Sequence, residues 1–276
     1  MSSPVSWRLE LFFKSKKELQ ERIVPFLKEN SIKRVNLTNK TKEDQLLECC
    51  RIISSAVPSA EICVHYSLKW NYSQSVEQSF QAFANFCATL AEDKQSSMLL
   101  VSGGGKKRKL DSVEALQRAA ACESIRAAPP IHVAFNPYFP SKAEAAEERK
   151  RLTRKLDTGL VRGIYLQMGT DMEKLKQALH FLKDASRDQH GNPMDLFGSV
   201  FLPTKRLLAQ MRFRPWNGVF LSEEYLSSVD KAQAITAEIL AVYSQHGVVP
   251  LVESKICTTQ ELRQCLDLLE GCHKNS

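Results

Sequence analysis

The sequence predicts an α/β protein folded as a single-domain (β/α)8 barrel, a TIM barrel, over residues 1–276. Short apolar runs alternate with amphipathic stretches, and eight such pairs follow one another along the chain. A length of 276 residues is ordinary for one such barrel. With 43% hydrophobic and 25% charged residues, the composition is that of a globular protein and excludes disordered and fibrous classes.

The predicted strands are runs rich in Val, Ile, Leu and Phe, as buried parallel strands require. They cover 8–13, 34–38, 62–67, 98–103, 131–136, 163–168, 199–203 and 248–252. Apolar residues spaced i, i+3, i+4, i+7 predict a covering helix after each strand. These helices cover 16–29, 42–56, 75–93, 111–124, 143–159, 171–186, 232–247 and 258–272.

Two local features refine this pattern. Thr258, with Glu261 three residues later, predicts a capping box at the start of the last helix. The long connection before the eighth strand contains the insert 210–228, which predicts extra helical turns or a lid. Functional loops of such barrels follow the carboxyl ends of the strands, so we expect the site there.

Charge and cysteine content indicate the kind of ligand and the cellular compartment to expect. The net charge of +7 suits an anionic ligand but does not by itself identify one. The eight cysteines show no CxxC pair and no Cys/His cluster at zinc spacing, which predicts reduced thiols and no metal site. Without a signal peptide or an apolar run long enough to span a membrane, we expect a cytoplasmic protein. A homo-oligomer is left open.

Three polar residues fall within or at the end of predicted strands. Glu10 in the first strand would face the barrel mouth, where a raised pKa suits a general acid; the alternative is an inward residue satisfied by a neighbouring strand. His65 in the third strand and Gln167 at the end of the sixth face the same end, although lone residues of these types are usually structural.

A glycine-rich and then basic segment closes the fourth strand. Ser102, Gly103 and Gly104 offer bare backbone amides to a flat or phosphorylated ligand, although the motif is neither GxGxxG nor a P-loop. The run Lys106–Lys109 then neutralises phosphates, serves as a nuclear import signal, or is a solvated loop. Nucleic-acid binding through this run is the weakest hypothesis, because it needs a contiguous basic face.

The chain resembles the catalytic barrel of methylenetetrahydrofolate reductase, a family of FAD-dependent enzymes. The stretch LTRKLDTGLVRGIYLQM at 152–168 is similar to that family's helix, Asp-x-Gly corner and strand ending in glutamine. Glu10 in LELFF lies where the family has its general acid. Thr38 lies where a flavin-contacting threonine follows the second strand, and His65 opens a segment like the family's His-Leu-Thr.

The resemblance implies further roles by position. Glu148 and Lys155 would hold the ribose and diphosphate side of FAD, Gln167 would bind the folate, and Lys255 replaces an arginine after the eighth strand. The implied reaction passes hydride from NAD(P)H through FAD to methylene-tetrahydrofolate or a related C1 carrier, with Glu10 and Gln167 as catalytic residues. The implied setting is one-carbon and methionine metabolism.

The chain departs from the family at two strand ends. Ser102-Gly103-Gly104 replaces Arg-Gly-Asp, so the carboxylate beside flavin and folate is missing at Gly104. The flavin-contacting segment after the fifth strand becomes 135–139, where Phe135 keeps apolar surface but polar contacts are lost. The alternative hypothesis is therefore a catalytically silent barrel of the same ancestry that binds a ligand or a partner.

Overall fold

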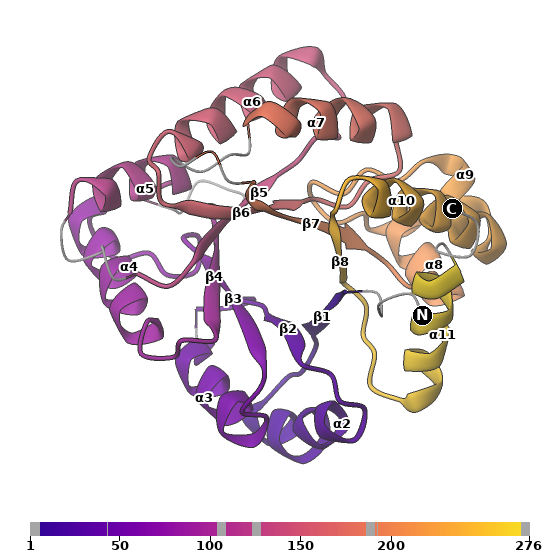
Figure 1. Cartoon of the computed structure of the whole chain (residues 1–276), viewed down its shortest axis with the longest axis horizontal. Helices are drawn as coiled ribbons and strands as arrows, with labels where there is room; N and C mark the ends of the chain where they lie inside the picture. Colours follow the sequence, from indigo (N-terminus) through magenta and orange to yellow (C-terminus); the bar gives the residue numbers. More distant parts are fainter. Residues whose placement is uncertain are drawn as a thin grey trace.

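Eight parallel strands close into a barrel, and helices form a ring around it (Figure 1). The computed structural model describes residues 6–42, 44–103, 109–122, 128–185, 191 and 193–271. The strands follow one another in chain order, and β8 pairs with β1 to close the sheet. They are β1 (Arg8–Leu11), β2 (Arg34–Leu37), β3 (Glu61–Ser67), β4 (Ser96–Val101), β5 (Ile131–Phe135), β6 (Val161–Leu166), β7 (Asp195–Val200) and β8 (Val249–Val252).

A helical segment follows each strand, as the periodicity predicts. The helix predicted over 16–29 consists of three consecutive segments with a π-helical turn, η1, in the middle. The helical segments are α1 (Lys16–Glu18), η1 (Leu19–Ile23), α2 (Val24–Glu29), α3 (Leu46–Ala56), α4 (Val76–Leu90), α5 (Ser112–Ala120), α6 (Lys142–Leu156), α7 (Met172–Ala185), α8 (Lys205–Phe213), α9 (Glu223–Ser227), α10 (Val229–Gln245) and α11 (Thr259–Gly271).

Alternating strand residues divide the core into two layers, because successive side chains point to opposite faces of a strand. The inner layer is a small cluster enclosed by the barrel, and the outer layer packs between the strands and the helices. The buried residues of the inner cluster are Cys63, Leu99, Tyr165, Phe197 and Leu251. This parity decides which strand residues reach the barrel mouth.

The predicted helix start and the predicted insert are both confirmed. Thr258 Oγ1 accepts from the Glu261 amide at 3.2 Å, and Glu261 Oε2 accepts from the Thr258 amide at 3.1 Å, which is the reciprocal pattern of a capping box. The β7–α10 connection forms α8 and α9. Between them the chain returns to β6, where Gly169 forms an isolated parallel bridge with Phe220.

The seventh strand begins at Asp195, four residues before the run predicted at 199–203. Its register with β6 pairs Tyr165 with Phe197 and Leu166 with Gly198. Gly198 lies against the ring of buried Tyr243 on α10, and a Cβ there would approach Tyr243 Cζ to 2.2 Å. A glycine inside an apolar run weakens the strand pattern, although here close helix packing requires it.

We expect Gly198→Ala to destabilise the fold by about 1–3 kcal/mol, because the added methyl must displace the packed Tyr243 ring. The free energy of unfolding in urea measures this loss. Gly271→Ala is the matched control, since its Cβ would meet nothing within 4 Å. A Gly198→Ala variant as stable as the unsubstituted protein would contradict this packing.

Candidate functional site

Two carboxyl side chains stand on adjacent strands at the carboxyl end of the barrel. The β1–β8 register pairs Arg8 with Leu251 and Leu9 with Val252, so Glu10 and Glu253 follow one residue further on. Both lie at inward positions, and the Ser199 hydroxyl of β7 donates to Glu253 Oε1. The mouth therefore holds a carboxyl pair where the sequence identified one acid.

Burial makes both carboxyl groups harder to ionise. Burial raises the pKa of Glu10 well above its usual value, the charge of Glu253 raises it further, and Lys40 opposes both effects. Burial raises the pKa of Glu253 to about 6, while the hydrogen bond from Ser199 works against that rise. Both groups keep their protons to higher pH than a free glutamate, so Glu10 can serve as a hydrogen-bond or proton donor.

Glu253 was missed from the sequence, although a signal was available. In β8 the inward residues are Val249 and Leu251, which pack against the inner cluster. Alternation therefore turns residue 253 inward, one step past the strand's end. The rule that functional residues follow barrel strands could have identified this glutamate.

His65 is connected by hydrogen-bond contacts to two buried polar side chains, Asn36 and Arg8. Arg8 Nε donates to Asn36 Oδ1 at 2.7 Å, and Asn36 Nδ2 lies 2.9 Å from His65 Nε2. Burial, with smaller effects from the charges of Arg8 and Lys40, lowers the pKa of His65 to about 3, so the imidazole is neutral at physiological pH. The predicted position of His65 at the mouth fits this geometry.

Gln167 and the β7–α10 connection cover the β5–β6 side of the mouth. Gln167 Oε1 accepts from the Met168 amide at 2.8 Å. Asn136 Nδ2, after β5, donates to the Gly218 carbonyl at 2.9 Å, which ties the connection across the strand ends. Gly218 has φ +82°, a left-handed conformation that favours glycine, and a Cβ there would lie 3.9 Å from Gln167 Nε2. The predicted lid is thus hydrogen-bonded to Asn136 and passes near Gln167.

Thr38 and Lys255 lie on the β8–β1–β2 side. Thr38 is partly buried and lines a pocket of about 150 Å³ at the ends of β1 and β2, together with Lys40. Lys255 is exposed after β8, and its charge contributes weakly to lowering the pKa of Glu18 on α1.

The two residues expected to hold the diphosphate side of FAD are engaged inside the protein. Lys155 is 5% exposed, and its Nζ donates to the Ala134 carbonyl of β5 at 3.2 Å. Glu148 Oε1 accepts from the Asn136 amide at 3.2 Å. Burial lowers the pKa of Lys155 and raises that of Glu148, while the attraction between the two groups opposes both shifts. In this arrangement the pair does not fit a diphosphate, because the buried Lys155 side chain would have to leave the Ala134 carbonyl.

The expected flavin contacts of β4 and β5 are also occupied by local structure. The Ser102 hydroxyl donates to Ser112 Oγ at 2.9 Å and accepts from the Ser112 amide. Gly103 has φ +71°, and a Cβ there would meet Lys69 Cβ at 2.5 Å. Phe135 is 1% exposed in the outer layer, where its ring centroid lies 6.1 Å from that of Phe181. Its side chain faces the helices rather than the mouth.

Part of the glycine-rich and basic segment lies outside the described residues, namely Gly104 and residues 106–108 of the Lys106–Lys109 run. Within the described ranges, no group of three or more His, Cys, Asp or Glu side chains is placed to hold a metal ion. The described cysteines are free thiols. No helix in the same ranges is long and apolar enough to cross a membrane.

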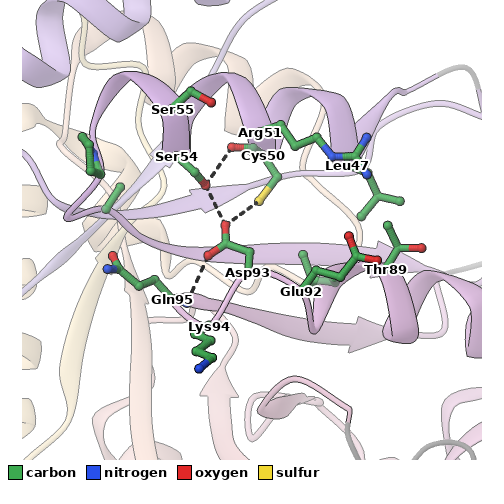
Figure 2. Close-up of a pocket in the computed structure, with 13 residues that line it drawn as sticks. Leu47, Cys50, Arg51, Ser54, Ser55, Thr89, Glu92, Asp93, Lys94 and Gln95 are labelled. Carbon is green, nitrogen blue, oxygen red and sulfur yellow. Dashed lines mark hydrogen bonds between the residues drawn. The ribbon is translucent and has the colours of Figure 1, made fainter.

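A pocket of about 420 Å³ lies away from the mouth, between α3 and the start of β4 (Figure 2). Asp93 is at its centre. Asp93 Oδ2 accepts from Ser54 at 2.6 Å and from Ser96 at 3.0 Å, and Oδ1 accepts from the Gln95 amide at 3.1 Å. Because the carboxylate already has these donors, it ties α3 to β4 and leaves little capacity for a ligand. We therefore take the barrel mouth, with its carboxyl pair, as the candidate site instead of this pocket.

Comparison with known proteins supports the fold alone. No family model and no curated protein matches the chain. An uncharacterized protein from Clostridium thermocellum that binds two copies of 5-methyl-5,6,7,8-tetrahydrofolic acid is similar in structure, with a TM-score of 0.65 and 10% identity. That similarity covers 100% of this chain and 96% of the other.

Two enzymes share the same architecture. A GH10 endoxylanase from a sugarcane soil metagenome has a TM-score of 0.53 and 13% identity, over 91% of this chain and 86% of its own. A putative 2,5-diketo-D-gluconic acid reductase B has a TM-score of 0.51 and 13% identity, over 98% of this chain and 86% of its own. Such different activities on one fold mean that function has to be argued from the site.

We expect Glu253→Gln to stabilise the protein at neutral pH and to change little at acid pH. A carboxyl whose folded pKa is about 6, raised from 4.5, favours the folded state below 4.5 and loses that contribution as the pH rises through 6. The loss amounts to about 2 kcal/mol, and glutamine avoids it while still accepting from Ser199.

The free energy of unfolding at about pH 4.5 and about pH 7.5 measures the difference. Glu21→Gln is the control, because it makes the same substitution on a side chain that is 67% exposed. A Glu253→Gln variant whose stability relative to the unsubstituted protein is the same at both pH values would refute the raised pKa.

Proposed function

We propose that the mouth of this barrel binds a reduced folate or a related C1 carrier. The observation that carries the proposal is the carboxyl pair of Glu10 and Glu253, with the Gln167 amide across the mouth. A pterin presents N–H donors beside a carbonyl and ring-nitrogen acceptors along one edge. Carboxyl and amide groups match such an edge, and a charged carboxylate strengthens each bond.

Two further points support this ligand class. The chain resembles the methylenetetrahydrofolate reductase barrel in sequence, and its fold is similar over the full length to that of a protein that binds methyl-tetrahydrofolate. The lid formed by the β7–α10 connection contacts Asn136 and approaches Gln167, so a ligand would be enclosed on the β5–β6 side. Partial enclosure with a few converging polar groups is typical of small-molecule sites.

A reductase is the second candidate, and the raised pKa of Glu10 favours it. Because burial raises its pKa, Glu10 holds its proton to higher pH than a free glutamate and can donate it to a folate nitrogen as the ring opens. Flavin as the hydride carrier and NAD(P)H as its source stay predictions of the resemblance. The engaged state of Lys155 and Glu148 argues against a diphosphate held at those two residues.

We expect the protein to bind 5-methyltetrahydrofolate, measured by isothermal titration calorimetry. Glu253→Gln should weaken the affinity by about 10- to 100-fold, because a charged hydrogen-bond acceptor becomes a neutral one. Glu21→Gln, which lies on the surface of η1, is the control and should bind normally. Absence of binding by the unsubstituted protein would refute the folate proposal.

We expect no flavin absorbance to survive desalting if the protein is a binding barrel without a cofactor. An absorbance spectrum from about 300 to 550 nm, before and after adding FAD, makes the test. Retained flavin peaks would favour the reductase, and Glu10→Gln should then keep flavin while losing folate turnover. If turnover stayed near that of the unsubstituted enzyme, Glu10 would not be the acid.

A further inference from the structure

A buried chain of three polar side chains runs from the inside of the barrel toward its mouth. Arg8 is 5% exposed and Asn36 0% exposed, so both side chains are buried. Arg8 is held in place by Nη2, which donates to the Val35 carbonyl at 2.8 Å and to the Glu61 carbonyl at 2.9 Å. Its Nε is therefore directed at Asn36, where the distance to Oδ1 is 2.7 Å.

The chemistry of this chain determines which way each group points. A guanidinium has donors only, so the Asn36 atom that faces Arg8 Nε must be the oxygen. The amide nitrogen of Asn36 then faces His65 Nε2, 2.9 Å away, and an amide nitrogen only donates. His65 Nε2 must accept, which means that a neutral His65 carries its proton on Nδ1.

The Nδ1 atom of His65 is available to a ligand. Within the described residues it forms no hydrogen bond. It is also absent from the buried polar atoms that lack a partner, so it is not fully enclosed by the protein. His65 is itself partly exposed, at an inward position in the C-terminal half of β3. A neutral N–H therefore lies on the inward side of β3, toward the end of the barrel that also holds the carboxyl pair.

We propose that Asn36 is a positioning residue that fixes His65 as an Nδ1–H donor, and that this donor selects ligands with a carbonyl or ring-nitrogen acceptor at that point of the mouth. The ligand part of this statement rests on the proposed function. The tautomer part does not, because it follows from Arg8 and Asn36 alone. Glu253 would meet a donor of the ligand, while His65 would meet an acceptor.

The first test needs no ligand. In the full-length protein with ¹⁵N-labelled histidine, long-range ¹H–¹⁵N correlation spectra at neutral pH distinguish a protonated, pyrrole-type nitrogen from an unprotonated, pyridine-type one. The chain has six histidines, and the His65 signals are assigned by their loss in His65→Gln. We expect a pyrrole-type Nδ1 and a pyridine-type Nε2. A pyrrole-type Nε2 would overturn the proposal.

The second test changes the residue that sets the tautomer. In Asn36→Asp the carboxylate still accepts from Arg8 but can only accept from His65, so Nε2 should become pyrrole-type. Asn136→Asp is the matched control, because it adds the same charge at the mouth on a residue that bonds to Gly218 instead of His65. An Asn36→Asp spectrum with an unchanged His65 pattern would overturn the positioning role.

The ligand arm separates this inference from the proposed function. If 5-methyltetrahydrofolate binds, Asn36→Asp should weaken it by about tenfold or more, as the loss of one matched hydrogen bond predicts. Unchanged affinity together with a switched tautomer would overturn the selection role while leaving folate binding intact. Absence of binding by the unsubstituted protein would refute the folate proposal, and the spectra would still decide the tautomer.

Discussion

The buried guanidinium of Arg8 is the constraint on which the polar interior depends. A charge removed from water has to be surrounded by acceptors, and Arg8 obtains them from β2 and β3, on the Asn36 side chain and on the carbonyls of Val35 and Glu61. Its guanidinium also lies 5.7 Å from the centre of the ring of Phe197, a residue of β7 in the inner cluster. Arg8 fixes the orientation of the Asn36 amide, and the Asn36 amide in turn determines which nitrogen of His65 accepts a hydrogen bond.

The carboxyl pair gives the barrel mouth a second acidic group at a position that the sequence comparison did not predict. The family that the sequence resembles has a carboxylate after strand four, where this chain has Gly104. In the structure a different carboxyl group, that of Glu253 after β8, lies next to the position of Glu10. The two positions are not equivalent, because the charge of Glu253 raises the pKa of Glu10. A second charge next to Glu10 therefore favours protonated Glu10, which a carboxylate farther around the barrel would do less strongly.

The sequence predicted the barrel well and the site in part, for one physical reason. Periodicity fixes which elements exist, so all eight strands were found, and β7 was displaced only because Gly198 and Asp195 interrupt its apolar run. A site depends on parity, and one residue along a strand reverses the face. Glu10, His65 and Gln167 fall on the inward parity. Phe135, next to the inward Ala134, faces the helices, and no apolar pattern could show that Lys155 turns back to a strand carbonyl.

The engagement of α6 limits the shape of ligand that this barrel suits. Lys155 bonds to the β5 carbonyl of Ala134, and Arg151 pairs with Asp111 at 3.3 Å, so α6 is held to both β5 and α5. Freeing Lys155 for a phosphate would break its hydrogen bond to the part-buried Ala134 carbonyl, at a cost of about 1–3 kcal/mol before any new bond forms. Glu10, Glu253 and His65 lie at inward positions toward the strand ends, so a ligand bound there requires no change in α6. The arrangement therefore favours a compact heterocycle bound at the strand ends over an extended dinucleotide that also needs α6.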